Sequence, residues 1–553
     1  ETNGFGFLLP DSNIPFDVFI PKPQINPTVI GKKVLVKVVS WDDSKKNPVG
    51  KIVKVIGNPK EHNTEIHSIL YQYNLDPIFP KHVEKVAEKI PLSLPNSEIK
   101  NRMDFRKTTT FTIDPVDAKD YDDALSVKKM SNGNWEIGIH IADVSYYVKE
   151  NDIIDREAAD RSTSVYLVDR VVPMLPEILS NEVCSLKANV DRFCYSVILE
   201  INEKSEILSH QIKKTVIHSD KRFTYQEAQD IIDSGKGLFS NELLILNNLS
   251  KILRKKRFSS GSINFDRQEV KFILDKDNNP TDVFFKESID TNHLIEEFML
   301  MANKIVAKEI GFLKKEEKTF VYRVHDKPDE DKINTLNNII KKFGYSINQT
   351  SPKNLSTSLN TLLKNVKGKS ESNMIETLTI RSMSKAIYTT NNIGHYGLNF
   401  NYYSHFTSPI RRYPDLIVHR LLEKYLSGEK SVEKNKIEDI CKYTSEKEKD
   451  AAMAERDSIK YMQAKFLQDK VGSNFEGVIS GVTEWGIYVE LEKNKCEGLV
   501  RISSIKGDFY VFDKNTYSII GRSSKNKYQL GDTVKIKIKN TDLEKKQINF
   551  ILV

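Results

Sequence analysis

The sequence lacks several features that would assign a protein to a class at once. It has 4 cysteines in 553 residues, and no two of them form a CxxC pair, so neither a zinc ribbon nor a disulfide framework is predicted. No uninterrupted apolar run reaches the roughly 18 residues that a bilayer requires. The first twenty residues also lack the basic-then-apolar order of a signal peptide. We therefore expect a cytoplasmic protein with reduced thiols and no membrane segment.

A strong excess of one charge is also lacking. The chain carries 83 Lys and Arg against 76 Asp and Glu, a net charge of +7, and 39% of its residues are hydrophobic. These values describe an ordinary folded protein, and the charge permits a polyanionic partner without requiring one. At roughly 100–200 residues per domain, a chain of this length is expected to form two to four domains.

The first segment of the chain has the pattern of a small β-barrel. Apolar and polar residues alternate in short runs punctuated by Gly and Pro. Gly4-Phe5-Gly6-Phe7 and Asp17-Val18-Phe19-Ile20 resemble the paired aromatic motifs of cold-shock domains, which are oligonucleotide-binding barrels. We assign residues 1–75 to such an RNA-binding OB-fold module. Because the first motif opens almost at the chain start, we expect that a preceding strand was trimmed from a longer protein. The residues expected to contact RNA are Phe5, Phe7 and Phe19.

The central part of the chain mixes strand and helix patterns. Strands are predicted at 109–113 and 135–144, and a helix repeat begins at Leu294. The stretch 345–375, rich in Ser, Asn and Lys, is expected to be a less ordered insertion or an exposed helical hairpin. Residues 445–470 contain no Pro or Gly and predict one long helix. We assign residues 76–470 to one α+β catalytic domain.

The last part of the chain, residues 471–553, returns to a β pattern. Its apolar and glycine-containing segments, in their order, look like an S1 domain, another OB-fold barrel. The predicted fold is therefore a multidomain α+β protein, with a mixed α/β domain between two small barrels. The matching segments are 475–479, 486–489, 497–500, 531–534 and 548–552.

The strongest chemical signal is a cluster of five aspartates within the ten residues from Asp114 to Asp123. Carboxylates packed this closely raise one another's pKa unless solvent separates them or a cation bridges them. Hard oxygen ligands suit Mg²⁺ or Mn²⁺, and phosphodiester hydrolysis is a reaction that uses such ions. The alternative is a solvated acidic turn after a strand. Apolar residues on both sides, such as Ile113 and Leu125, favour instead a loop at the end of a buried sheet, where uncompensated charge is costly.

Two other ligand classes are excluded. Counting from Asp120, the sixth position of an EF-hand would be Leu125 rather than Gly, and the twelfth would be Ser131 rather than Glu. Gly368-Lys369-Ser370 has the end of a P-loop, but Leu363 occupies the position of the earlier glycine. We therefore predict no calcium sensor and no nucleotide cofactor.

Several segments, taken in chain order, carry a family resemblance. Together with the aspartates they resemble the ribonuclease II/ribonuclease R family of RNB-type exoribonucleases over nearly the whole chain. The segments 164–166, 323–328 and 405–416 are most similar to the ribonuclease R branch. The matching segments are 140–148, 164–166, 173–176, 179–181, 295–297, 323–328, 395–398 and 405–416.

The resemblance implies roles for the charged residues. Asp114 and Asp123 are expected to bind Mg²⁺ directly, with Mn²⁺ as the other candidate ion. Asp120 and Asp122 would complete the site, and Asp122 would matter most for catalysis. For Asp120 the alternative is a supporting hydrogen-bond acceptor, and Asp117 is not expected to be a ligand. Arg411 would contact the phosphates, since a planar guanidinium can grip two phosphate oxygens.

The resemblance also implies contacts with the terminal nucleotides. Tyr166 and Phe265 would stack on the 3′-terminal bases, which suits an enzyme indifferent to sequence. Glu296 would orient the terminal nucleotide as part of the catalytic set. The alternatives are core packing for either aromatic residue and a structural salt bridge for Glu296. His140, on an alternating strand, is expected to be a packed and hydrogen-bonded histidine.

The function that follows from the resemblance is processive 3′→5′ hydrolysis of single-stranded RNA, and of structured RNA, to nucleoside 5′-monophosphates. We expect a monomer that binds the 3′ end of RNA. The alternative from another class is a non-catalytic RNA-binding regulator that keeps both barrels around a decayed nuclease site.

Overall fold

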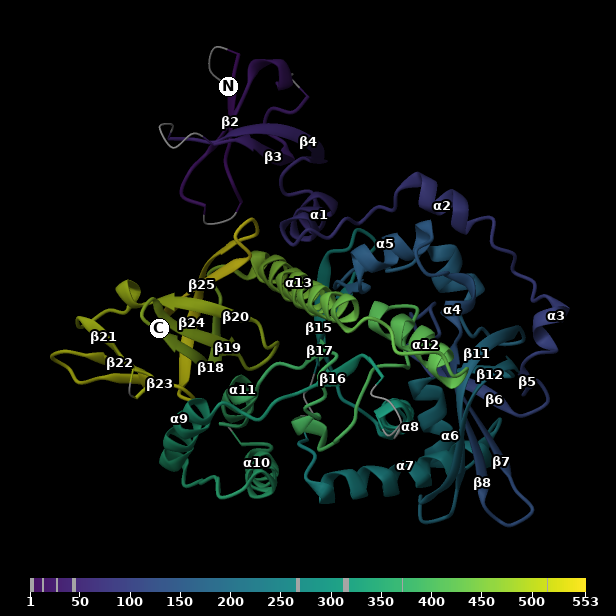
Figure 1. The fold of residues 1–553 in the computed structure, drawn as a ribbon. Helices are drawn as coiled ribbons and strands as arrows, with labels where there is room; N and C mark the ends of the chain where they lie inside the picture. Colours follow the sequence, from purple (N-terminus) through teal and green to yellow (C-terminus); the bar gives the residue numbers. More distant parts are fainter. Residues whose placement is uncertain are drawn as a thin grey trace.

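The protein consists of a small N-terminal β-module, a large central body and a C-terminal β-barrel (Figure 1). The structure, a computed structural model, describes residues 4–11, 14–25, 28–41, 46–264, 269–311, 318–369, 371–514 and 516–553. This arrangement confirms the predicted α+β architecture with a mixed central domain between two β-modules. The limits drawn after residues 75 and 470 stay predictions.

The N-terminal module is a four-stranded sheet in the order β1-β2-β4-β3. Phe7 on β1 lies opposite Phe19 on β2 in the antiparallel register, so the two aromatic motifs come together. Helix α1 (His62–Gln72) follows the module. The strands are β1 (Gly6–Leu8), β2 (Val18–Ile20), β3 (Lys33–Ser40) and β4 (Val49–Gly57).

The central body is built on a seven-stranded sheet in the order β13-β6-β7-β8-β11-β12-β5. Its neighbours are antiparallel except at the two edges, where β13 pairs with β6 and β5 pairs with β12 in parallel. Strands β8 and β11 are buried along most of their length, which indicates cover on both faces of the sheet. The strands are β5 (Met103–Asp104), β6 (Thr110–Asp114), β7 (Asp123–Lys129), β8 (Trp135–Ala142), β11 (Asp191–Ile201), β12 (Ile207–His218) and β13 (Lys221–Thr224).

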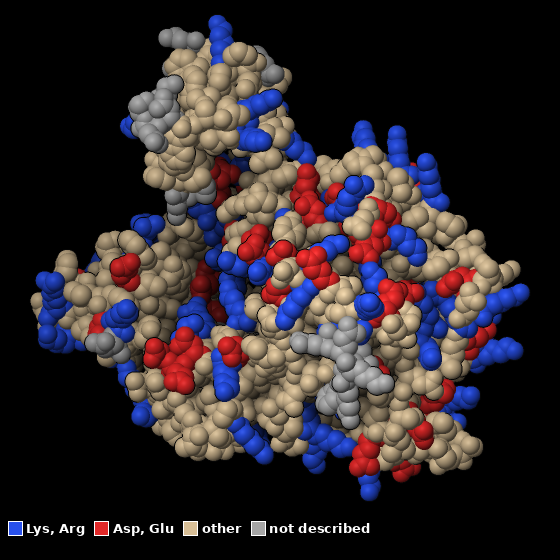
Figure 2. All heavy atoms as spheres, viewed as in Figure 1, with Lys and Arg blue, Asp and Glu red and all other residues tan. Residues whose placement is uncertain are grey.

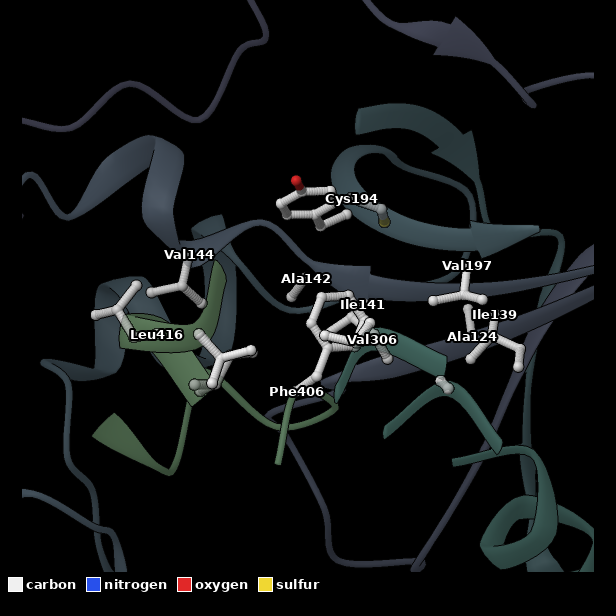
Figure 3. Close-up of a cluster of buried hydrophobic side chains, with 14 of the residues drawn as sticks. Ala124, Ile139, Ile141, Ala142, Val144, Cys194, Val197, Val306, Phe406 and Leu416 are labelled. Carbon is white, nitrogen blue, oxygen red and sulfur yellow. The ribbon is translucent and has the colours of Figure 1, made fainter. Parts of the chain in front are cut away.

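Helices cover this sheet and carry the largest hydrophobic core. Figure 3 shows Ile141 of the sheet beside Val306 and Phe406, with Leu416 farther along the same core, all of them buried. Each buried aliphatic side chain of this kind contributes about 1.5–3 kcal/mol relative to exposure. The helices of this part include α4 (Val144–Tyr147), α5 (Ile153–Arg161), α6 (Tyr225–Ser234), α7 (Ser240–Ser260), α8 (Asp290–Gly311) and α12 (Tyr413–Leu426).

The predicted strand over 135–144 was two residues too long. Strand β8 ends at Ala142, and Val144 begins helix α4. Asp143 caps that helix by accepting a hydrogen bond from the Tyr146 backbone N–H. Val144 is apolar and buried although it begins a helix, so it continues the apolar pattern of the strand. The pattern alone therefore does not reveal where the strand ends and the helix begins.

The stretch at 345–375 forms two helices, the second of which runs on to Ser382, and they complete a second core. Of the two predicted descriptions, the helical hairpin is the correct one, but it is not simply exposed. Leu359, Leu362 and Ile375 are buried in the same cluster as the C-terminal barrel core. The helices of this region are α9 (Glu330–Ile340), α10 (Pro352–Val366) and α11 (Ser372–Ser382).

The long helix predicted over 445–470 is α13, which runs from Lys434 to Phe466. It therefore starts earlier and ends sooner than predicted, and a short 3-10 turn, Gln468–Lys470, follows it. Asp457 on α13 accepts hydrogen bonds from Tyr73 at 3.1 Å and from Lys546 at 2.8 Å. This one carboxylate thus ties together the segment after α1, the long helix and the C-terminal barrel.

The C-terminal module is a closed barrel in the order β18-β19-β20-β25-β24, with a separate three-stranded sheet beside it. The barrel strands are β18 (Asn474–Thr483), β19 (Gly486–Leu491), β20 (Glu497–Arg501), β24 (Thr533–Asp542) and β25 (Gln547–Leu552), and the separate sheet holds β21 (Tyr510–Asp513), β22 (Ser518–Gly521) and β23 (Lys527–Gln529).

Surface charge agrees with the balanced composition. Figure 2 shows acidic and basic side chains mixed over the visible face rather than one uniformly basic surface. In the described part of the chain, no helix has the length and hydropathy to cross a bilayer.

Candidate nuclease site

The acidic loop joins two neighbouring strands of the central sheet. Asp114 is the last residue of β6 and Asp123 is the first residue of β7. The loop between them is held by its backbone: the Ser185 hydroxyl accepts from the Tyr121 N–H at 3.0 Å, and the Asp122 carbonyl accepts from the Ala142 N–H at 2.9 Å. The carboxylates therefore lie where β6 ends and β7 begins, at the end of buried strands, as the flanking apolar residues predicted.

Burial makes the charged form of these carboxylates costly. Asp114 is 8% exposed and Asp122 is 5% exposed. Burial, reinforced by the charge of Asp123, raises the pKa of Asp114 to about 7. Burial also raises the pKa of Asp123, and it raises that of Asp122 well above its ordinary value, although Arg411 opposes both shifts. The solvated acidic turn is therefore the wrong alternative for these residues.

Arg411 lies directly beside the acidic loop. Its Nε is 3.5 Å from Oδ2 of Asp122, and the neighbouring Ile410 N–H donates to Oδ1 of Asp122 at 2.9 Å. The Arg411 side chain remains 39% exposed. The guanidinium can therefore reach a ligand at the loop while its charge partly compensates Asp122.

The aspartate side chains of the loop are oxygen donors of the class that hard divalent cations prefer. Oδ2 of Asp114 is buried and has no hydrogen-bond partner among the described residues. Within those same residues, no three His, Cys, Asp or Glu side chains are arranged so that they could hold a metal ion. The chain thus brings several carboxylate oxygens and one partially compensating arginine to the loop, and the remaining negative charge is of the kind that Mg²⁺ or Mn²⁺ neutralises.

Tyr166 belongs to the same site. It lies on the short strand β9 (Val165–Tyr166) and is 39% exposed. Burial raises the pKa of Asp120, and a hydrogen bond with Tyr166 partly opposes that shift. The predicted stacking residue and the predicted metal site are thus neighbours.

Glu296 lies in a separate ion-pair network. Its carboxylate is 3.0 Å from Nη1 of Arg254 and 3.1 Å from Nη2 of Arg257. Burial alone would raise its pKa, but His293 and these two arginines lower it. Glu296 therefore makes structural salt bridges, which was the alternative to a role in nucleotide binding. Its contact with a terminal nucleotide stays a prediction.

Three predicted aromatic residues gather on the N-terminal module. The rings of Phe5, Phe7 and Phe19 are 5.5–6.0 Å apart between centroids, and Phe7 is 46% exposed. Phe5 and Phe19 are partly buried, so the three rings form an aromatic group, exposed mainly at Phe7, of the kind on which bases stack. Phe265, the other predicted stacking residue, lies outside the described residues.

The structure also tests the expectations for Asp117 and His140. Asp117 is exposed, which agrees with its exclusion from the ligand set. His140 is fully buried between the Ser126 and Ser196 hydroxyls, at 2.9 Å and 2.8 Å, and burial lowers its pKa to about 3. The predicted packed histidine is confirmed.

Sequence reasoning missed Tyr225 at this site. Tyr225 begins helix α6 directly after β13. Burial, with the nearby charges of Asp123 and Asp114, raises the pKa of its hydroxyl. The only sequence signal was the helix start at Thr224, which marks a cap and not a site.

Comparison with known proteins agrees with this geometry. Family models match in chain order: the cold shock domain at residues 7–80, the RNB domain at 102–428 and the S1 RNA binding domain at 468–552. Ribonuclease R of Aquifex aeolicus is 37% identical over 558 residues, which cover 98% of this chain and 78% of that protein.

Solved structures give the same result. Mycoplasma genitalium ribonuclease R with ribose-methylated single-stranded RNA has a TM-score of 0.90 at 27% identity, covering 97% of this chain and 85% of that chain. Its complex with double-stranded RNA has a TM-score of 0.85 at 25% identity, covering 97% and 92%. The yeast pseudonuclease Ssd1, at 20% identity and a TM-score of 0.75 over 94% and 66%, shares the fold alone. The chain therefore belongs to the RNB family of 3′→5′ exoribonucleases, in its ribonuclease R branch.

Proposed function

We propose that this protein is a divalent-metal-dependent, processive exoribonuclease that removes nucleoside 5′-monophosphates from the 3′ end of RNA. The observation that carries the proposal is a cluster of carboxylates, the buried Asp114 and Asp122 and the partly buried Asp123, beside the partly exposed side chain of Arg411. Such a cluster is costly by itself and becomes favourable with cations and a phosphate.

The aspartates have distinct proposed roles. Asp114 and Asp123, at the facing ends of β6 and β7, would ligate Mg²⁺ or Mn²⁺, and Asp120 and Asp122 would complete the site. When bound, the metal supplies a water of lowered pKa and neutralises charge on the phosphate. Asp122 is held in place by the Ile410 N–H, so its orientation does not depend on the ligand.

Arg411 acts on the phosphate. Its Nη2 donates to the Ser408 hydroxyl at 2.9 Å, which fixes the guanidinium plane and leaves other N–H groups for phosphate oxygens. Attack of water on the terminal phosphodiester breaks the bond to the 3′ oxygen of the preceding nucleotide, which takes a proton. The terminal unit leaves with its 5′-phosphate, and preorganised donors stabilise the developing charge.

The terminal nucleotides would be held by stacking and hydrogen bonding. Tyr166, next to Asp120, would stack on a terminal base, with Phe265 as its partner. Glu296, which forms ion pairs with Arg254 and Arg257, would orient the last nucleotide. Stacking accepts every base, so degradation would not depend on sequence.

The two OB-fold modules would collect the strand. Phe5, Phe7 and Phe19 offer stacking surfaces, and the ribonuclease R of Mycoplasma genitalium is solved with both single- and double-stranded RNA. We infer that this chain degrades single-stranded RNA and structured RNA. One chain carries every proposed site residue, so a monomer suffices, and an enzyme of RNA turnover is expected in the cytoplasm.

A non-catalytic RNA-binding regulator is the rival, because the RNB fold alone also occurs in a pseudonuclease. The complete carboxylate set and Arg411 favour the enzyme. The test is a gel assay of 5′-end-labelled RNA with Mg²⁺, comparing the parent with Asp122→Asn. Conversion of the full-length strand to a short labelled 5′-end product by the parent alone supports the enzyme, whereas binding without cleavage by both proteins supports the regulator.

A further inference from the structure

The loop Ser408–Arg412, which carries Arg411, is anchored by a buried carboxylate that the proposed mechanism does not use. Asp415, in the first turn of α12, is fully buried. Its Oδ1 accepts from the Ser408 backbone N–H at 2.8 Å and from Nη2 of Arg412 at 2.7 Å. A single oxygen atom therefore holds both ends of this loop.

The opposite side of the loop is held by the segment that leads to Tyr166. The Arg411 carbonyl accepts from the Ser164 N–H at 3.0 Å and from the Thr163 hydroxyl at 3.2 Å. The Tyr413 N–H donates to the Ser162 carbonyl at 2.9 Å. Asp415 thus supports the loop on one side and the segment 162–164 supports it on the other.

The anchored loop makes two contacts with the acidic site. The Ile410 N–H donates to Asp122, and the Arg411 Nε lies 3.5 Å from the same carboxylate. A displacement of the loop would move both groups relative to the scissile phosphate. Misplacement of about 1 Å at a catalytic group can cost about 100-fold in rate.

We propose that Asp415 is a positioning residue for catalysis, which sets the place of Arg411 by binding the Ser408 N–H and the Arg412 guanidinium together. The proposal rests on the proposed nuclease function and deepens it. Asp415 contacts neither RNA nor metal ligands in this account, so its effect must pass through the loop.

A buried carboxylate that pairs with an arginine could also act on stability alone, and the chain offers a matched control for that case. Asp155 is buried, and its Oδ1 lies 2.8 Å from Nη2 of Arg420. Its carboxylate also accepts from the Tyr413 hydroxyl at 3.0 Å and from the Asn151 N–H at 2.6 Å. Like Asp415, it pairs with an arginine and accepts from a backbone N–H, and it has the Tyr413 hydroxyl as a further partner. None of these partners of Asp155 lies within the loop Ser408–Arg412.

The test is a double-mutant cycle on single-turnover RNA cleavage, with thermal unfolding and RNA affinity measured in parallel. Asp415→Asn and Asp155→Asn are each made in the parent and in Arg411→Ala, and Asp122→Asn serves as the inactive reference. We expect Asp415→Asn to lower the cleavage rate of the parent by about 10- to 100-fold at unchanged RNA affinity. In Arg411→Ala the same change should cost at least about fivefold less, whereas Asp155→Asn should show no such coupling.

The proposal is overturned if Asp415→Asn keeps the parent rate, or if it loses the same factor in both backgrounds. If Asp415→Asn does not fold, Arg412→Lys carries the same cycle, because it removes the guanidinium fork and leaves the Ser408 contact intact. A parent protein that cleaves no RNA would overturn the proposed function first, and this inference with it.

Discussion

Replacing Asp114 by Asn is expected to stabilise the protein when no divalent cation is present. Burial raises the pKa of Asp114 from 3.8 to about 7, and each pKa unit corresponds to about 1.36 kcal/mol. Charging Asp114 in the folded protein therefore costs up to about 4 kcal/mol at pH 8. The amide of Asn brings donors that need partners, which leaves an expected net gain of about 1–3 kcal/mol.

The pH dependence of that gain has a defined sign. A carboxyl group whose pKa is raised by folding stabilises the folded state below its unfolded pKa and loses this contribution as the pH rises through its folded pKa. At pH 4 Asp114 is protonated in the folded parent, so only the cost of the amide donors remains and Asp114→Asn should be slightly less stable than the parent. The variant should gain by up to about 4 kcal/mol relative to the parent between pH 4 and about 7, and the difference should then remain constant. With Mg²⁺ the order should reverse, because the parent alone gains the binding free energy of the ion.

The assay is urea unfolding of both proteins in EDTA and in Mg²⁺, from pH 4 to pH 8. Asp117→Asn is the control, since Asp117 lies in the same loop but is exposed, and it should change stability by less than about 0.5 kcal/mol. The reasoning is refuted if Asp114→Asn is less stable than the parent in EDTA at pH 8, or if the difference does not vary with pH.

Two further predictions concern RNA turnover. Arg411→Lys keeps the positive charge but loses the planar guanidinium, so kcat should fall by about 100- to 1,000-fold with little change in RNA affinity. Steady-state kinetics on a fluorescent oligonucleotide measures both quantities. A kcat near that of the parent would contradict the role of Arg411 at the phosphate. Tyr166→Ala should raise KM for short oligonucleotides by about 5- to 150-fold because base stacking is lost. Tyr166→Phe keeps the ring, so its KM should stay close to that of the parent. Equal KM values for all three proteins would show that Tyr166 does not stack on a base.

The parts of the site that could be predicted from sequence are those whose signal is local. Five aspartates between apolar strand residues already implied a costly loop at a sheet edge, and Asp114 and Asp122 are buried there. His140 on an alternating strand was expected to be packed, and the structure confirms it. The apolar patterns likewise predicted a strand and a helix where β6 and α8 lie, although β6 runs from Thr110 to Asp114 instead of 109–113 and α8 begins at Asp290, before Leu294.

The parts that could not be predicted depend on contacts between distant segments. Tyr225 comes close to Asp123 only because β13 adds to the sheet edge next to β6. Glu296 finds Arg257 on the adjacent helix α7, and no spacing in the sequence signals that pair. The boundary at Val144 was missed for the opposite reason, since burial continues while the backbone changes from strand to helix.

The central claim is that the acidic loop forms a divalent-cation site beside Arg411. Crystals of the Asp122→Asn protein with Mn²⁺ and a short RNA, measured at the manganese absorption edge, test it most directly. The account predicts an anomalous peak in contact with carboxylate oxygens of Asp114 and Asp123, with the terminal phosphate within reach of Arg411. An ordered RNA 3′ end with no peak at these aspartates, or with the manganese bound elsewhere, would contradict it.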